Sequence, residues 1–186
     1  AYDPKTKKYD FHPVFAPVKD ILSAADLTIA NLETTLPGSR KRYSGYPTFG
    51  APDSLAQALK DSGVDVLSLA NNHTVDKGKS GLLRTIEVVD KLGFAHLGSY
   101  RSMKDYSARR ILQIQRNGLR LALLNYTYGT NGIRVPQGTV VNLIKARTIA
   151  EDLAAARKLK PDAIIVLYHY GGEYLRKPDK YQIKWT

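Results

Sequence analysis

Short apolar runs alternate with segments of helical periodicity along most of this chain. The apolar runs predict strands at residues 26–33, 64–70, 94–98 and 162–170, and the helical spacing predicts helices at 14–25, 52–63, 80–92 and 144–159. Two further strand-like runs within residues 109–128 flank Asn117-Gly118, a dipeptide that favours a tight hairpin turn. Strands that alternate with helices, with one antiparallel hairpin, predict an α/β fold, a layered sandwich with a mixed sheet.

The size and composition of the chain predict a single domain over residues 1–186. A chain of 186 residues with 43% hydrophobic content can bury one sizeable core. The sequence has no Cys, which excludes disulfides and zinc-thiolate sites. No apolar run approaches the roughly 20 residues that a membrane-spanning helix needs.

The charge balance favours a polyanionic partner. Lys and Arg total 28 against 17 Asp and Glu, which gives a net charge of +11. Nucleic acid, an anionic membrane or wall polymer, and an acidic polypeptide all fit this charge. The motifs of the common nucleic-acid modules are missing, so no nucleic-acid partner is expected.

Polar side chains follow three of the predicted strands. These residues are Asn31 and Glu33 after the first strand, Asn71, Asn72, His73 and Asp76 after the second, and His169, Glu173 and Tyr174 after the last. Ligands in open α/β sheets sit beyond the carboxyl ends of the strands, so these groups are expected to share one crevice. Imidazole and oxygen ligands of this kind can hold a divalent metal.

Each residue also has a purely structural interpretation. Asn71-Asn72 alone fits a strand-to-loop turn, His73 alone fits a satisfied structural histidine, and Glu33 alone fits a solvated carboxylate. The three strand ends taken together favour a functional crevice. In the long loop at residues 37–50, Arg40 and Arg42 fit either a solvated face or a grip on an anionic ligand. The loop Gly129–Gly132 lacks the Lys of a phosphate-binding loop and is interpreted as an ordinary loop.

The motifs around these residues resemble the bacterial capsule-synthesis family typified by CapA, also called PgsA, of poly-γ-glutamate biosynthesis. The resemblance covers residues 26–182 and includes IANLETTL, ANNH followed by D-x-G-x-x-G, NYTYGTNG and HYGGEYLRKPDKYQ. It implies a fold similar to calcineurin-like metallophosphoesterases.

The resemblance also implies roles for the crevice residues. Glu33, Asn72 and His169 would be ligands of a divalent metal (Zn, Mn or Fe), and His73 would be a general acid or a stabiliser of the transition state. From their places in the sequence, Asp76 and Glu173 are further candidate catalytic residues. The candidate substrate-binding residues are Asn31, Asn71, Arg40, Arg42 and Tyr174.

Several positions depart from the pattern of the superfamily. The superfamily has an acidic residue directly after the His, whereas this chain has Thr74 there and reaches Asp76 only two positions later. Tyr170 occupies the position where the capsule family usually has Trp. An opening Gly-Asp segment and a closing Gly-His-x-His-like segment, both expected to donate ligands, are not present. We therefore expect this chain to be part of a longer, membrane-anchored protein whose anchor and C-terminal part lie outside it, exposed at the cell surface.

Three functions compete at this stage. The first is a capsule protein that handles poly-γ-glutamate outside the membrane, together with other membrane proteins of the synthesis and export complex. The second is a metal-dependent hydrolase of a phosphoester or amide bond. The third is a non-catalytic module whose basic surface binds an anionic wall polymer. A retained fold does not by itself imply retained chemistry.

Overall fold

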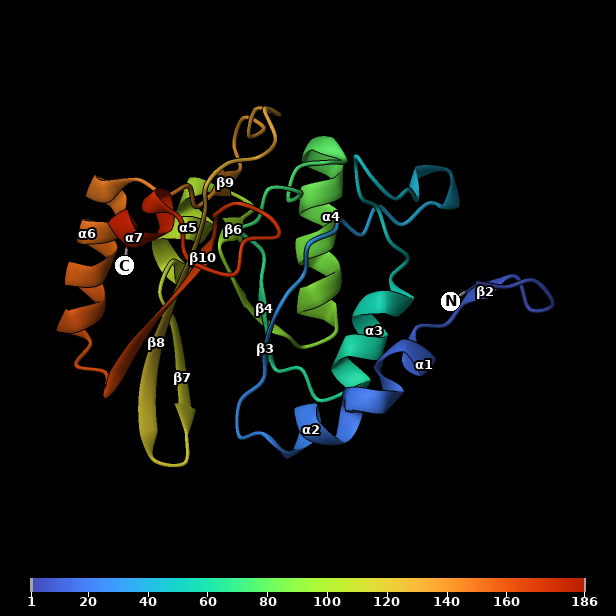
Figure 1. The fold of residues 1–186 in the computed structure, drawn as a ribbon, viewed down its shortest axis with the longest axis horizontal. Coiled ribbons are helices and arrows are strands. Elements are labelled where there is room, and N and C mark those ends of the chain that lie inside the picture. Colours follow the sequence, from blue (N-terminus) through green and yellow to red (C-terminus); the bar gives the residue numbers. More distant parts are fainter. Residues whose placement is uncertain (1, 186) are drawn as a thin grey trace.

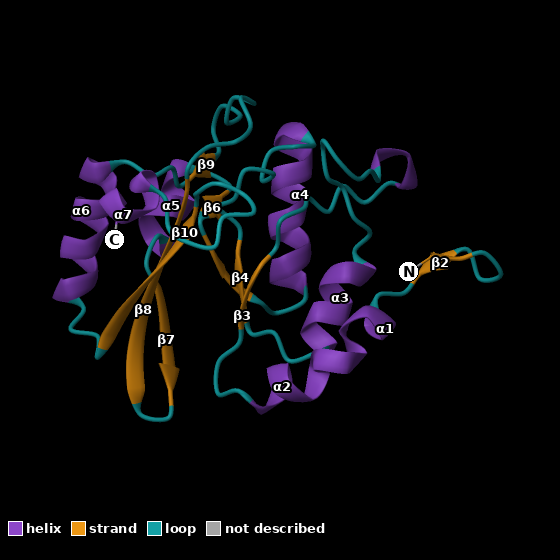
Figure 2. Ribbon diagram, in the orientation of Figure 1, coloured by secondary structure: helices purple, strands orange, loops and turns teal. Residues whose placement is uncertain are grey.

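The computed structural model describes residues 2–185, with two three-stranded sheets at its centre and helices on the outer sides (Figure 1; Figure 2). The first sheet is parallel and contains β3 (Ile29–Asn31), β4 (Val66–Ser68) and β5 (Ala95–Leu97). The second has the order β10-β8-β7 and is mixed. In it, β10 (Ala163–His169) runs parallel to β8 (Leu119–Thr127), and β8 runs antiparallel to β7 (Leu112–Arg116).

Neighbouring residues of the central strands face different layers of the molecule. Val66 of β4 packs with Leu97 and Leu123 between the two sheets, whereas the adjacent Leu67 faces the helices on the outer side of the first sheet. On β8, Leu124 turns to the opposite face from Leu123 and packs beside Ile149 of the helix that covers the second sheet. The order of layers is therefore helix, sheet, sheet, helix, and the α/β sandwich expected from the sequence is confirmed.

The main helices lie close to the expected ranges. These are α3 (Ser54–Asp61) and α4 (Gly78–Lys91) on the first sheet and α6 (Ala146–Lys158) on the second. The hairpin is also confirmed, because Asn117 and Gly118 both have positive φ angles, 48° and 80°, as a tight turn of this kind requires.

The first predicted helix is divided in the structure. Instead of one helix over 14–25, the chain forms α1 (His12–Phe15), a 3-10 turn η1 (Ala16–Val18) and α2 (Lys19–Ala24). Pro17 within η1 has no backbone N–H, so a continuous helix would lose one of its hydrogen bonds there.

The sequence patterns did not reveal the smaller elements. These are β1 (Tyr2–Asp3), β2 (Lys8–Tyr9), η2 (Arg40–Arg42), β6 (Ser99–Tyr100), α5 (Met103–Arg109), β9 (Val140–Val141) and α7 (Lys180–Trp185). The start of α5 did carry a local signal, because the Ser102 hydroxyl accepts a hydrogen bond from the backbone N–H of Asp105 at 3.1 Å. Within residues 2–185, no helix combines the length and the apolar character that crossing a bilayer would demand.

Asn125, near the carboxyl end of β8, ties the two sheets together. Its side chain accepts a hydrogen bond from the backbone N–H of Ala70 at 2.8 Å and donates one to the carbonyl of Leu167 at 3.1 Å. Ala70 begins the loop after β4, and Leu167 belongs to β10. This buried amide therefore holds the end of β4 against the end of β10, where the predicted site residues lie.

Candidate functional site

Three residues predicted as metal ligands lie together at the carboxyl ends of the strands. His169 is the last residue of β10, Glu33 follows β3 by two residues, and Asn72 lies in the loop after β4. The Nε2 atom of His169 is 2.8 Å from Asn72 Oδ1 and 3.5 Å from Glu33 Oε1. Although β10 belongs to a different sheet from β3 and β4, the facing arrangement of the sheets brings the three side chains to one rim.

His73 forms a buried pair with Asp76 beside this rim. His73 Nδ1 is 2.7 Å from Asp76 Oδ2, and the two side chains are only 8% and 1% exposed. The same carboxylate oxygen accepts the backbone N–H of Phe49 at 2.6 Å, and the Phe49 ring packs 4.2 Å from the imidazole. Because the carboxylate accepts from Nδ1, the other ring nitrogen of His73 is left for a ligand, and Asp76 orients the imidazole from behind.

The side chain of Asn71 shapes the loop that carries Asn72 and His73. Asn71 is completely buried, donates to the carbonyl of Leu32 at 2.9 Å and to Asn31 Oδ1 at 3.1 Å, and accepts the N–H of His73 at 3.0 Å. These bonds link the loop after β4 to the end of β3. The geometry therefore gives Asn71 a positioning role instead of the direct substrate contact expected from the sequence. Asn31 lies closer to the surface, where it also donates to Glu33 Oε2 at 3.1 Å.

Asn131 and Tyr128 are site residues that the sequence analysis missed. Asn131 Oδ1 accepts hydrogen bonds from Asn72 Nδ2 and from the Tyr128 hydroxyl, both at 3.2 Å, and the Tyr128 ring stacks on the His169 ring with centroids 6.2 Å apart. By accepting from Nδ2, Asn131 directs the amide oxygen of Asn72 toward His169. The loop Gly129–Gly132 is thus more than an ordinary connection. Its position directly after β8, which runs parallel to β10, was the available signal.

Two adjoining cavities of about 370 and 480 Å³ form the crevice, and both are lined by Asn72, Tyr128 and Glu173. The first continues along Glu33, His169 and the chain at 170–172, and the second along His73, Asp76, Asn131, Ile133 and the loop at 46–48. Tyr174 is 98% exposed and lines neither cavity. The crevice lining carries three carboxylates and two imidazoles, and of the residues in 2–185 no Lys or Arg lines either cavity.

The structure places Arg40 and Arg42 away from the crevice. Both belong to η2, where the Arg40 guanidinium lies 4.6 Å from the centre of the Tyr2 ring and Arg42 donates to the carbonyl of Lys77 at 2.6 Å. The expectation that they face Glu33 assumed that the loop at 37–50 folds over the end of β3. The loop instead carries η2 to the side of the molecule where the N-terminal hairpin lies (Figure 1).

Burial favours the neutral form of His169. Desolvation lowers the pKa of His169, the negative charge of Glu33 opposes this shift, and the neighbouring His73 lowers the pKa further. A neutral imidazole has a lone pair that can bind a metal ion or accept a proton.

The donor atoms at the rim fit one divalent ion. An imidazole nitrogen, an amide oxygen and a carboxylate oxygen converge there, a combination that suits a borderline cation such as Zn, Mn or Fe. Within residues 2–185, no cluster of three or more His, Cys, Asp or Glu side chains could hold a metal. The described residues therefore offer a partial ligand set for a single ion.

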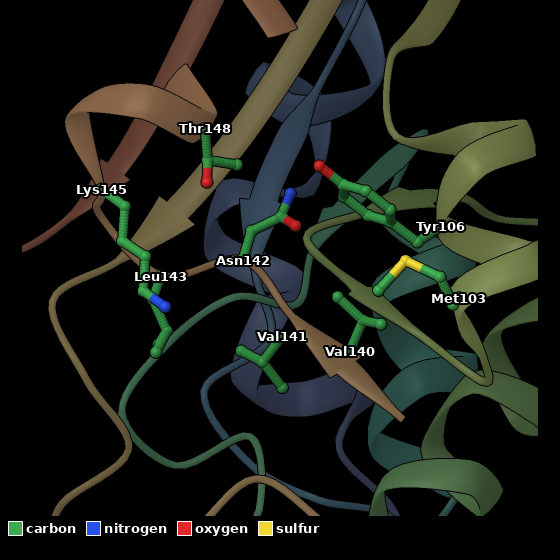
Figure 3. Close-up of a pocket in the computed structure, with 8 residues that line it drawn as sticks. All are labelled: Met103, Tyr106, Val140, Val141, Asn142, Leu143, Lys145 and Thr148. Carbon is green, nitrogen blue, oxygen red and sulfur yellow. The ribbon is translucent and has the colours of Figure 1, made fainter. Parts of the chain in front are cut away.

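A separate cavity of about 330 Å³ lies between α5 and the start of α6 (Figure 3). It is lined mainly by apolar side chains such as Met103, Val140 and Leu143, with Lys145 and Thr148 at one side. Neither an imidazole nor a carboxylate lines it, so this cavity lacks the acid-base and ligand groups that the crevice carries.

Comparison with solved structures identifies the class of fold. Haemophilus influenzae NAD nucleotidase (NadN) superposes with a TM-score of 0.56 at 17% identity, over 88% of this chain and 29% of that one. At this level of identity the similarity concerns the fold alone, and it agrees with the calcineurin-like fold expected from the sequence.

Sequence comparison then identifies the family. The chain belongs to the family described as bacterial capsule synthesis protein PGA_cap, whose sequence model matches residues 1–186. It is 29% identical to the capsule biosynthesis protein CapA of Bacillus anthracis over 94% of this chain, and 27% identical to the PGA biosynthesis protein CapA of Bacillus subtilis over 91%. The chain spans 44% and 45% of the length of these two relatives.

Proposed function

We propose that this chain works in capsule assembly by holding poly-γ-glutamate at the outer face of the membrane, beside other membrane proteins of the synthesis and export complex. The observation that carries the proposal is the convergence of Glu33, Asn72 and His169 at one rim, in a chain of the capsule synthesis family. The polymer carries one carboxylate on each residue, and the name of the Bacillus subtilis relative, a PGA biosynthesis protein, supports this choice.

The acidic lining of the crevice determines how such a polymer could bind. Glu33 and Glu173 would repel a carboxylate that approached them alone. A divalent ion held by Glu33, Asn72 and His169 would supply the positive charge that binds a carboxylate or polarises an amide carbonyl. Asn131 would keep the oxygen of Asn72 turned toward the ion, and the second ring nitrogen of His73 would form a hydrogen bond with the bound chain.

A second candidate function is hydrolysis of an amide or phosphoester bond in the same crevice. The buried pair of His73 and Asp76 favours it, because an imidazole oriented by a carboxylate is suited to proton transfer. Holding a polymer does not require such a pair. Under this alternative His73 would protonate the leaving group, and Glu173, which lines both cavities, would be the second acid-base group.

Measurements of polymer binding and of polymer degradation distinguish the two candidate functions. Binding of poly-γ-glutamate is measured with Mn²⁺ and with a chelator, for the wild type, Glu33→Gln, His169→Ala and the surface control His12→Ala. Holding of the polymer predicts that affinity falls about tenfold or more with the chelator and in the two rim variants, and is unchanged in the control. Polymer binding that neither the chelator nor His169→Ala weakens would contradict the proposal.

The fate of the polymer tests the alternative. Under hydrolysis, prolonged incubation shortens poly-γ-glutamate or releases phosphate from a phosphoester, and His73→Ala stops the reaction while binding persists. A polymer of unchanged length that remains bound, with no phosphate released from a general phosphoester, excludes hydrolysis and leaves the holding function.

A further inference from the structure

The positive charge of this protein lies outside the crevice. The net charge is +11, yet of the residues in 2–185 only acids and histidines contribute ionisable groups other than Tyr to the two crevice cavities. One bound metal ion could neutralise a single carboxylate of an anionic polymer. A longer polymer needs further cations along the protein surface, so the surface over which it binds depends on where the unpaired Lys and Arg side chains lie.

A group of basic residues comes directly after the crevice-lining residues 168–173 in the sequence. Arg176, Lys177, Lys180 and Lys184 all belong to residues 171–185, which we call the C-terminal basic segment, and all four are exposed. Within residues 2–185, none of the four forms an ion pair, whereas Arg84, Arg101, Arg109, Arg110, Arg116, Arg120 and Arg147 are each paired with an acid. Lys184 Nζ lies 5.7 Å from the centre of the Trp185 ring, and among the described residues the positive charges of all four are left without a neighbouring acid that pairs with them.

Several contacts fasten this segment to the wall of the crevice. The backbone N–H of Gly172 donates to Asp179 Oδ2 at 3.0 Å, and Tyr170 packs against Tyr181 with ring centroids 6.0 Å apart. The Tyr170 hydroxyl also donates to the carbonyl of Gln182 at 3.4 Å. Because Tyr170 and Gly172 line the 370 Å³ cavity, α7 and its cations are held next to it. Figure 1 shows the red chain leaving the end of β10, looping outward and returning to α7.

We infer that the C-terminal basic segment is a docking surface for an anionic polymer that extends out of the crevice. Arg176, Lys177, Lys180 and Lys184 would pair with successive carboxylates, while the exposed Tyr174 and Leu175 contact the aliphatic part of the chain. Continuity with the crevice favours a polymer over an anionic lipid surface, which the same cations could also attract. This inference rests on the proposed function, from which it takes the identity of the polymer.

The chain offers a matched control for this surface. Lys5, Lys7 and Lys8 are three exposed cations of the N-terminal hairpin, on the far side of α4 from β10 (Figure 1). The variant R176Q/K177Q/K180Q and the control K5Q/K7Q/K8Q each lower the net charge by three. Any effect of net charge alone is therefore equal in the two variants, and only a local surface distinguishes them.

The experiment measures binding of long poly-γ-glutamate to both triple variants in the presence of Mn²⁺. Exposed ion pairs contribute little individually, so we expect the loss of three to weaken affinity by about tenfold in low salt, with less than about a twofold change in the control. A di-γ-glutamate peptide, which is short enough to stay within the crevice, should bind the segment variant as well as the wild type. Circular dichroism checks that both variants are folded.

Each contrary result has a distinct meaning. If the wild type does not bind the polymer, the proposed function fails. If the wild type binds but both triple variants are equally weakened, or the segment variant is unchanged, the docking surface is refuted and the proposed function stands. If the segment variant loses only its binding to phosphatidylglycerol vesicles, the surface belongs to a lipid and the inference is overturned.

Discussion

Replacing Asn125 by Ala should weaken both the fold and the site, because this residue joins the two sheets. Asn125 is 2% exposed, and its amide makes two hydrogen bonds, to the N–H of Ala70 and to the carbonyl of Leu167. A buried hydrogen bond contributes about 1 kcal/mol, and a buried donor left without a partner costs a further 1–3 kcal/mol or so. The Asn125→Ala substitution would leave the Ala70 N–H unpaired, so the free energy of unfolding should fall by about 2–4 kcal/mol.

Urea unfolding followed by circular dichroism measures this change, with Gln113→Ala as the control. Gln113 lies on β7 in the same sheet but is exposed, so its replacement should change the free energy of unfolding by less than about 0.5 kcal/mol. The folded fraction of Asn125→Ala should also bind Mn²⁺ more weakly, since Asn72 would no longer be held against His169. If Asn125→Ala unfolds at the same urea concentration as the control, the two sheets do not depend on this residue and the argument fails.

Three further predictions concern single residues near the site and in the core. Asn131→Ala should weaken Mn²⁺ binding about tenfold or more, measured by electron paramagnetic resonance, whereas Asn131→Asp keeps an acceptor for Asn72 and should bind nearly as well as the wild type. Burial lowers the pKa of His96, which is 2.9 Å from Asp90 and near Arg109. Below about pH 6.5, His96 is protonated in the unfolded chain but stays largely neutral in the folded one. The free energy of unfolding is therefore at its full value above that pH and falls as the pH drops below it. The urea midpoint should fall less between pH 7.5 and pH 5.5 in His96→Gln than in the wild type. An equal fall in the two proteins would exclude His96 as the cause. A Cβ atom at Gly98, where φ is +97°, would lie 2.1 Å from Asn125 Oδ1 and 2.7 Å from the Ala70 N atom. Gly98→Ala should thus lower the thermal midpoint clearly, and by less in the Asn125→Ala background, where part of the clash is removed; strictly additive losses would argue against a shared cause.

The sequence predicted the layers of the fold better than the division of its strands between sheets. The apolar run of residues 162–170 and the hairpin at Asn117-Gly118 correctly indicated a mixed sheet. Periodicity reports which faces of a strand are buried, and both faces are buried in β4 and in most of β8. It does not report which strands are neighbours. The pairing of β10 with β8 and the packing of that sheet against the first one depend on long-range contacts that no local pattern encodes.

The site was predicted where its residues follow strands and missed where they act through other residues. Glu33, Asn72 and His169 were expected to lie together because each follows a predicted strand, and the family resemblance supplied their role as metal ligands. Asn131 belongs to a loop, and its role depends on one hydrogen bond with Asn72 across 59 positions of sequence. The burial of Asn71 could not be predicted either, because the residue type alone does not distinguish an Asn that stabilises a loop from an Asn that contacts a ligand.

The location of charge is the feature that sequence alone could not give. From the net charge of +11 and the place of the loop in the sequence, Arg40 and Arg42 were candidates to bind an anion in the crevice. In the folded chain, both arginines lie away from the crevice. The crevice is lined by acids and histidines, which favour a cation there, while the cations of the C-terminal basic segment belong to a chain that is fastened to its wall. Under the two proposals above, a cation in the crevice and the basic side chains beyond it would make separate contributions to the binding of an anionic chain. Metal dependence and salt dependence of polymer binding should therefore respond to different substitutions, the first to changes at His169 and the second to changes at Arg176 and Lys177.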